Sequence, residues 1–329
     1  MTKSLPINLT LVVLALLCAM LSLGLGPAHL GWGRAFAALI GQGDPIATTI
    51  VWQLRLPRSL LALMIGAMLG GAGAALQGYL RNPLADPGVL GTSSTAALGA
   101  VFALYYGFAA ISPLTLPLFA IVGALVGLIP LLLLAARSEG PLALILAGVA
   151  IATAAGAGIS LAINFAPNPF AAIEIMTWLM GSLADRSFLH VCLALPCIAI
   201  GLGLILLEGR ALDALTLGEE GATALGVNLR RTRLSLLIAT AIGVGGAVAV
   251  SGSIGFVGLV VPHLVRPFTD RRPSSLLIPS ALGGAALLAA ADALVRSVPT
   301  LDEPRLGVVT ALIGVPIFLH QLMRARRQW

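Results

Sequence analysis

Acidic and basic side chains are scarce in this sequence, so one that lies in an apolar segment is a candidate for chemistry. Asp292 is the main example, and Arg296 follows it at a spacing of one helical turn. An unpaired acid inside a membrane helix is typical of proton coupling, whereas an acid paired with an arginine near a helix end is typical of a structural ion pair. We favour the ion pair with Arg296 and keep a proton relay through Asp292 as the alternative.

Side-chain arrangements typical of an enzyme have little support. Ser93 and Ser94 lie in a GTSST segment that faintly resembles an intramembrane nucleophile, but serine at the start of a membrane helix usually bonds to the backbone. The histidines lie in separate segments, without the spacing of a metal site: His29, His190, His263 and His320. We therefore predict no catalytic residue and no bound metal.

A nucleotide-binding lysine is also lacking. The GxxxxGK[ST] phosphate loop needs a lysine that reaches the terminal phosphates, and Lys3 is the only lysine of the chain. We therefore expect no cofactor in this chain. If ATP drives its activity, ATP and Mg are bound by a partner ATPase.

Composition indicates a membrane protein. Of the 329 residues, 58% are hydrophobic and 10% are charged, and the mean hydropathy is +1.02. A helix that crosses a bilayer needs about 20 apolar residues. We predict an all-α polytopic membrane protein of about ten transmembrane helices, with residues 1–329 in a single domain. The predicted spans are residues 7–25, 59–80, 88–106, 113–136, 141–165, 188–207, 234–251, 253–265, 274–298 and 306–323.

The net charge of +6 indicates membrane orientation rather than nucleic-acid binding. If the amino terminus is cytoplasmic and ten spans alternate, thirteen of the 19 Lys and Arg residues lie inside and six lie outside. This bias follows the positive-inside rule. Both termini are therefore predicted to be cytoplasmic, together with a charged segment at residues 213–233.

Small residues recur every four positions in several runs, which puts them on one helix face. One such stripe begins at Gly148, continues through Gly156 and ends in the polar Ser160 and Asn164. It is a candidate for lining a path through the membrane, with helix packing as the alternative. The other two stripes favour packing: Gly66, Gly70, Ala74 and Gly78, and Ala239, Gly243, Ala247, Ser251 and Gly255.

Longer motifs occur in a fixed order along the chain. They are WQLRLPRSLLALMIGAMLGGAGAALQGYLRNPLADPGVLG (52–91), LTLGEEGATALGV (215–227), GSIGFVGLVVPHLVR (252–266) and LGVVTALIGVPIFL (306–319). Together they resemble the signature stretches of the FecCD family, the bacterial ABC-importer permeases for ferric siderophores, haem and cobalamin. One departure is DEPRLGVV, where family members more often have a small apolar residue followed by LPxGVV.

The resemblance implies an assembly in the lipid of the bacterial inner membrane. It comprises a homodimer of permease subunits, two ATP-binding ATPase subunits and a periplasmic substrate-binding protein. Residues 213–233 would form cytoplasmic coupling helices, although charge alone is more typical of a solvated loop. The contact with the ATPase is assigned to Leu215, Gly218, Glu219, Ala222, Leu225 and Gly226. Arg55, Arg58 and Arg296 match arginines that dock the binding protein, with anchoring at the lipid headgroups as the alternative.

These observations predict a permease subunit that moves a metal chelate from periplasm to cytoplasm and is not itself an enzyme. A ferric siderophore is the favoured substrate, and cobalamin and haem stay open. An ion-coupled secondary transporter that uses Asp292 is the alternative of a different class.

Overall fold

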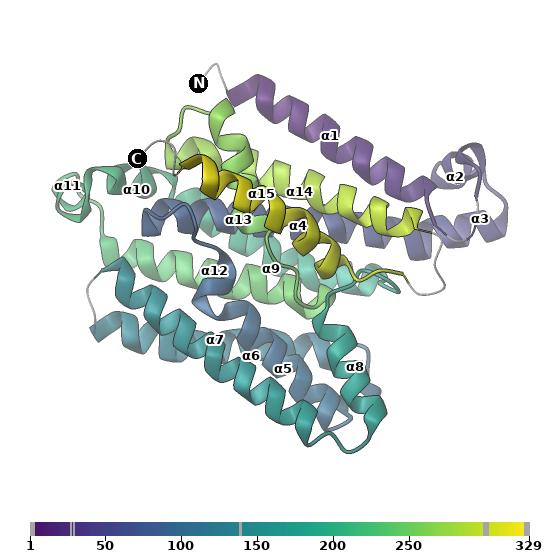
Figure 1. Ribbon diagram of the computed structural model, residues 1–329. Helices are drawn as coiled ribbons and strands as arrows, with labels where there is room; N and C mark the ends of the chain where they lie inside the picture. The colour runs from purple at the N-terminus through teal and green to yellow at the C-terminus, as the bar shows by residue number, and fades with distance from the viewer. Residues whose placement is uncertain (1–3, 27, 29, 138–139, 299–302, 326–329) are drawn as a thin grey trace.

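The computed structural model describes residues 4–26, 28, 30–137, 140–298 and 303–325, and every regular element among them is a helix (Figure 1). The long helices are α1 (Ser4–Gly24), α4 (Leu56–Leu80), α6 (Thr115–Arg137), α7 (Pro141–Asn164), α9 (Phe188–Leu207), α12 (Leu229–Ser251), α14 (Pro273–Ser297) and α15 (Leu306–Ala325). The shorter ones are α2 (Trp32–Leu39), α3 (Pro45–Thr49), α5 (Thr92–Tyr105), α8 (Pro169–Leu179), α10 (Gly209–Ala214), α11 (Glu219–Ala224) and α13 (Val257–Val265).

The predicted all-α class is confirmed for the described residues. Each of the ten predicted runs coincides with a helix, and 7 segments are long and apolar enough to cross a membrane. The described parts of α5, α13 and α15 are apolar but shorter. The structure therefore supports a multi-pass membrane protein, while the number of ten spans stays a prediction.

The helices form two groups joined by a central pair. Helices α1, α4 and α14 pack together on one side, and α5, α6 and α7 pack together on the other (Figure 1). Between them lie α9 and α12, and α12 contacts both α4 and α6. Helix α15 packs against α13 and α14 and leaves an apolar face exposed, formed by Val308, Leu312, Val315 and Leu319.

The contact between α4 and α14 brings two helix backbones together. A Cβ atom on Gly66 would overlap the carbonyl oxygen of Gly284, and one on Gly284 would overlap the carbonyl oxygen of Gly66. Gly70 approaches the carbonyl of Ser280 in the same way. Small residues allow such approach in lipid, where association depends on close packing rather than on a hydrophobic driving force. The packing interpretation of the stripe from Gly66 to Gly78 is confirmed at this contact.

Helix α4 continues a longer helical segment than the sequence indicated. The helix is unbroken from Pro45 to Leu80, over 36 residues. Asp44 caps its start, because the Asp44 carboxylate accepts a hydrogen bond from the Ala47 N–H. Residues Ile50–Arg55 form a π-helical turn inside it. This extra length carries the arginines of the RLPR motif before the predicted start of the span at residue 59.

The two ends of the bundle hold different short helices (Figure 1). The start of α1 and the end of α15 lie at the end that also holds α10 and α11. Helices α2 and α3 lie at the opposite end, near the last residues of α14. The described ends of the chain and the predicted coupling segment therefore share one side.

We predict that Gly284→Leu strongly destabilises the protein, because the new side chain must separate α4 from α14. Inserting bulk into a well-packed site costs about 1–3 kcal/mol, and more where backbone is displaced. The matched control is Gly203→Leu on α9, since a Cβ there meets nothing within 4 Å. Thermal unfolding in detergent measures the difference. Equal melting temperatures for the two variants would contradict the assigned contact.

Candidate functional site

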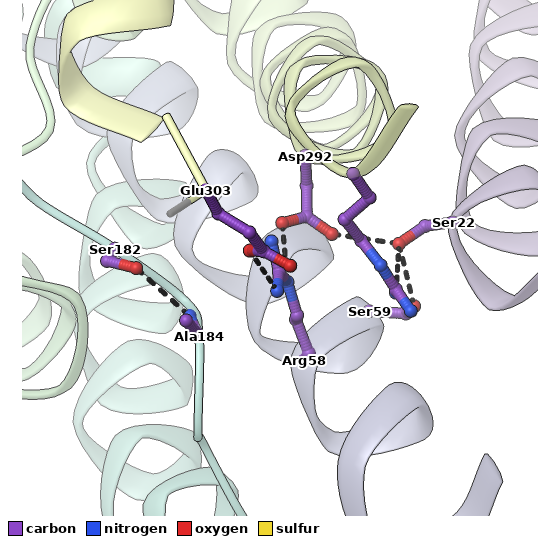
Figure 2. A network of polar contacts seen from close by, with 8 residues as sticks. Ser22, Arg58, Ser59, Ser182, Ala184, Asp292 and Glu303 are labelled. Carbon is purple, nitrogen blue, oxygen red and sulfur yellow. Dashed lines mark hydrogen bonds and ion pairs between the residues drawn. The ribbon is translucent and has the colours of Figure 1, made fainter. Parts of the chain in front are cut away.

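Polar side chains meet between α1, α4 and α14 at the end of the bundle near α2 and α3. Arg58 on α4 lies between two carboxylates (Figure 2). Its Nε donates to Asp292 Oδ1 at 2.8 Å and its Nη1 donates to Glu303 Oε2 at 2.7 Å. We call Ser22, Arg58, Ser59, Asp292, Arg296 and Glu303 the arginine network.

Ser22 on α1 connects the remaining members of the network. Its hydroxyl donates to Asp292 Oδ2 at 2.8 Å and accepts from Arg296 Nη1 at 3.0 Å and from the Ser59 hydroxyl at 3.3 Å. One donor and two acceptor positions are what a serine hydroxyl offers. The predicted ion pair between Asp292 and Arg296 is therefore wrong. Asp292 pairs with Arg58, because tertiary packing brings α4 nearer to this carboxylate than the arginine one turn away.

The network is a buried ion pair with its hydrogen bonds satisfied at Asp292. Asp292 is 0% exposed and Arg58 is 8% exposed. Charges removed from water are tolerated when they are paired and fully bonded, and removal of one partner leaves the other uncompensated. These contacts support the structural interpretation of Asp292 over the proton relay.

Arg55 lies next to the network and is held by backbone. Its Nη1 donates to the Leu23 carbonyl at 2.7 Å and its Nη2 to the Ala28 carbonyl at 3.1 Å. Arg55 is 3% exposed and Arg296 is 9% exposed. These contacts do not favour the alternative of anchoring at the lipid headgroups, because Arg55 and Arg296 are nearly buried and their guanidinium groups bond inside the protein.

The three predicted docking arginines nevertheless share one cavity. We call it the arginine cavity; its volume is about 440 Å³. Arg305 also lines it, together with the carboxylates of Asp185 and Glu303. The structure thus brings Arg55, Arg58 and Arg296 together, and a partner's carboxylate would have to enter this cavity to reach them.

The charged segment at the other end of the bundle folds into short helices. Helix α10, a 3-10 turn at Leu215–Leu217 and α11 follow one another, with Gly218 at φ 93° between the turn and α11. Gly226 has φ 83° just after α11. Both glycines stand in the left-handed region that other residues avoid. Gly221 lies inside α11.

Hydrogen bonds fix this α10–α11 segment to the start of α14. Asp213 Oδ1 accepts from the Ser274 N–H at 2.8 Å, and its Oδ2 accepts from the Ser274 hydroxyl at 2.6 Å. A carboxylate at a helix N-terminus satisfies free N–H groups and interacts favourably with the helix dipole. Asp213 therefore links α10 directly to the first turn of α14.

The predicted ATPase contact residues divide into two groups. Leu215 and Ala222 are buried in the core of this chain, so the prediction that their side chains face a partner is corrected. Leu225 and Gly226 are exposed, and Gly218 and Glu219 are partly exposed. Leu217, which the sequence interpretation left out, is 68% exposed and Leu225 is 65% exposed.

The candidate path on α7 has one packed end and one open end. Gly148 packs against the backbone at Val89. A Cβ on Gly156 would meet nothing within 4 Å, and Ser160 and Asn164 are exposed. The face from 156 to 164 is therefore free within this chain, and the assignment of a path stays a prediction.

Three segments cross at the start of α15. The Ser182 N–H donates to the Ser251 carbonyl at 2.7 Å, which joins the end of α8 to the end of α12. A Cβ on Gly307 would overlap the Met180 carbonyl, so α15 begins against this crossing. An apolar concavity of about 550 Å³ opens beside it, lined by residues that include Phe256 and Leu312.

Comparison with known proteins decides the family. The model of the FecCD transport family matches residues 14–324. The chain belongs to the FecCD family. The family recognised from the sequence motifs is thereby confirmed.

Relatives of this FecCD chain carry different cargoes by name. A vitamin B12 import system permease protein of Vibrio cholerae is 43% identical over 277 residues, with 84% of this chain and 83% of the relative covered. A hemin transport system permease protein of Yersinia pestis is 40% identical, with 95% of each covered. An Fe(3+) dicitrate transport system permease protein of Escherichia coli is 42% identical, with 94% and 95% covered.

A solved structure shares the fold of this FecCD chain. It is described as an inward-facing conformation of a metal-chelate type ABC transporter. The TM-score is 0.85 at 31% identity, and 97% of this chain and 99% of the other are covered.

Sequence reasoning missed Ser22 and Glu303. Ser22 lies in an apolar run where nothing marks it, and it acquires its role only because α1 packs on α14. Glu303 did leave a signal, since it belongs to the DEPR segment that departs from the family pattern. Its partner Arg58 lies 245 positions away, which no local spacing reveals.

We predict that Asp292→Asn lowers the melting temperature substantially, because Arg58 loses its buried counter-charge. Breaking a buried pair in this way costs about 3–5 kcal/mol. Asp185→Asn is the control, since Asp185 lines the same cavity but is exposed. Thermal unfolding in detergent is the measurement. A D292N protein as stable as D185N would favour a functional rather than a structural acid.

Proposed function

We propose that this chain is the permease subunit of an ATP-binding-cassette importer that carries a metal chelate into the cytoplasm. The match to the FecCD family across residues 14–324 is the observation that carries the proposal. A ferric siderophore is the favoured cargo. Cobalamin and haem are the alternatives, and the relatives named for vitamin B12, hemin and Fe(3+) dicitrate have similar identities of 43%, 40% and 42%.

The assembly we propose has this chain as a homodimer of ten-span subunits in the bacterial inner membrane, with both termini cytoplasmic. Two ATPase subunits, which bind ATP and Mg themselves, contact the α10–α11 end of the single permease domain. A periplasmic binding protein docks at the arginine cavity. The exposed apolar face of α15 and the open face of α7 supply surfaces for the second permease subunit and for the path.

The geometry supports a route for coupling along α14. Asp213 holds the first turn of α14 to α10, and Asp292 and Arg296 lie in its last turns. With 25 residues, α14 is about 37 Å long at ~1.5 Å per residue. A tilt imposed on α10 by closing ATPases would therefore reach the arginine cavity through one helix, as a shift between two conformations.

An ion-coupled transporter that uses Asp292 is the rival class. Its acid would need to exchange protons with water, yet Asp292 is 0% exposed and bonded to Arg58 and Ser22. A carboxylate that is paired in this way is typical of a structural role. The contacts therefore support the ATP-driven proposal.

Uptake into vesicles tests the function. The complete complex is placed in ATP-loaded proteoliposomes, and labelled ferric siderophore, cobalamin and haem are each presented on the binding protein. We expect ATP-dependent accumulation of one class, with ferric siderophore as the first candidate, and no loss of uptake with a proton uncoupler. Uptake by the permease alone that collapses with the uncoupler would establish the rival class.

A second experiment tests the coupling surface. We predict that Leu217→Asp with Leu225→Asp leaves the fold intact but reduces co-purification with the ATPase about tenfold, because truncating or charging a central apolar contact costs this much. Both side chains are exposed, so the fold does not depend on them.

Two further variants complete this experiment. Ile46→Asp changes an equally exposed apolar residue at the opposite end and should leave ATPase binding unchanged. Ala222→Leu should instead lower stability, because Ala222 is 0% exposed. Normal ATPase binding by the double variant would remove the α10–α11 segment from the interface.

A further inference from the structure

Glu303 reaches Arg58 from the segment that precedes α15. The carboxylate is 2.7 Å from Arg58 Nη1, and the side chain of Glu303 is 26% exposed while that of Arg58 is 9% exposed. Asp292 holds Arg58 from the opposite side through Nε, so the two carboxylates contact different nitrogens (Figure 2). Asp292 is enclosed in the helix bundle, whereas Glu303 can leave through the cavity.

The arginine cavity has an excess of positive charge. Four arginines line it against two carboxylates, Asp185 and Glu303. Within the described part of the chain, Arg296 Nε is buried and has no hydrogen-bond partner. Guanidinium groups bind carboxylates with two donors at once. The cavity therefore suits a carboxylate at Arg58 Nη1, where Glu303 now supplies one.

The position of Glu303 in the chain connects this cavity to α15. Gly307 follows four residues later and begins α15 against the crossing with Met180 and Ser253. The apolar concavity of about 550 Å³ is lined by residues of that crossing, Met180, Ser253 and Gly307. Glu303 thus lies three residues before Leu306, the first residue of α15.

We propose that Glu303 is an internal carboxylate that occupies Arg58 until an acidic side chain of the binding protein displaces it, and that the exchange frees the start of α15. This inference rests on the proposed function, since it takes the arginine cavity as the docking surface. The partner's carboxylate takes over the Arg58 Nη1 contact, while Asp292 keeps Arg58 in place. The energetic cost of docking is low because one charge-assisted hydrogen bond replaces another.

The first experiment uses the purified full chain alone. Glu303→Ala should make Arg58 react with phenylglyoxal about threefold faster, as expected for losing a partly exposed ion pair. Peptide mass spectrometry measures the modification, and Arg55, held by backbone carbonyls, serves as the internal standard. Hydrogen exchange at the first turn of α15 should also increase. Glu174→Ala on α8 is the control, because it removes an exposed carboxylate outside the network.

The second experiment measures capture of the binding protein that co-purifies with the complex in nanodiscs. Glu303→Ala should raise the association rate about threefold, because a competing carboxylate is gone and charge affects mainly the rate of association. A merely structural role for Glu303 would slow capture or destabilise the chain instead.

The outcomes distinguish failure of the inference about Glu303 from failure of the proposed docking surface. Unchanged Arg58 modification in Glu303→Ala overturns the inference, and so does capture that is no faster although Arg58 is unshielded. If Arg55→Glu with Arg58→Glu leaves capture intact, the arginine cavity is not the docking surface and that part of the proposed function fails. The modification experiment decides the shielding by Glu303 independently of that result.

Discussion

The backbones of α4 and α14 touch at Gly66 and Gly284, and this approach sets the geometry of the polar groups at one end of the bundle. Arg58 projects from one of these helices and Asp292 from the other. Larger side chains at the crossing would hold the helix axes further apart and stretch an ion pair that is now 2.8 Å long. The close packing of small residues in lipid therefore also sets the distance between the buried charges.

Burial restricts which groups can surround the guanidinium groups of the arginine network. A guanidinium in a dry site must have its charge balanced and its donors bonded. Arg55 meets the second requirement with carbonyls alone, whereas Arg58 uses carboxylates from two elements. The arginines that match docking residues of the family therefore also stabilise the structure in this conformation.

The local sequence pattern was sufficient to predict the apolar helices but insufficient to predict most of their tertiary contacts. Apolar length predicted where the ten apolar runs form helices, and the small-residue stripe of α4 predicted a close contact, because both depend on neighbours in the chain. The partner of Asp292 was misassigned, since an arginine on the same helix is the only candidate that spacing can offer. Ala222 was assigned to the ATPase contact from the family resemblance. Its burial is set by how the α10–α11 segment folds onto the core, which a six-residue helix does not encode by periodicity.

The π-helical turn at Ile50–Arg55 affects how this chain tolerates changes in length. In this turn the Leu56 N–H reaches back to the Val51 carbonyl, one residue further than in an α-helix. A π turn is equivalent to one residue inserted into an α-helix, and each residue of a regular helix adds about 100° of rotation. Because the wider turn takes up the extra residue locally, loss of one residue here would restore regular helix without that rotation, and α3 would keep its orientation about the axis of α4. Arg58 and the residues below it would keep their orientation, so the turn separates variation in the α2 and α3 region from the geometry of the ion pairs.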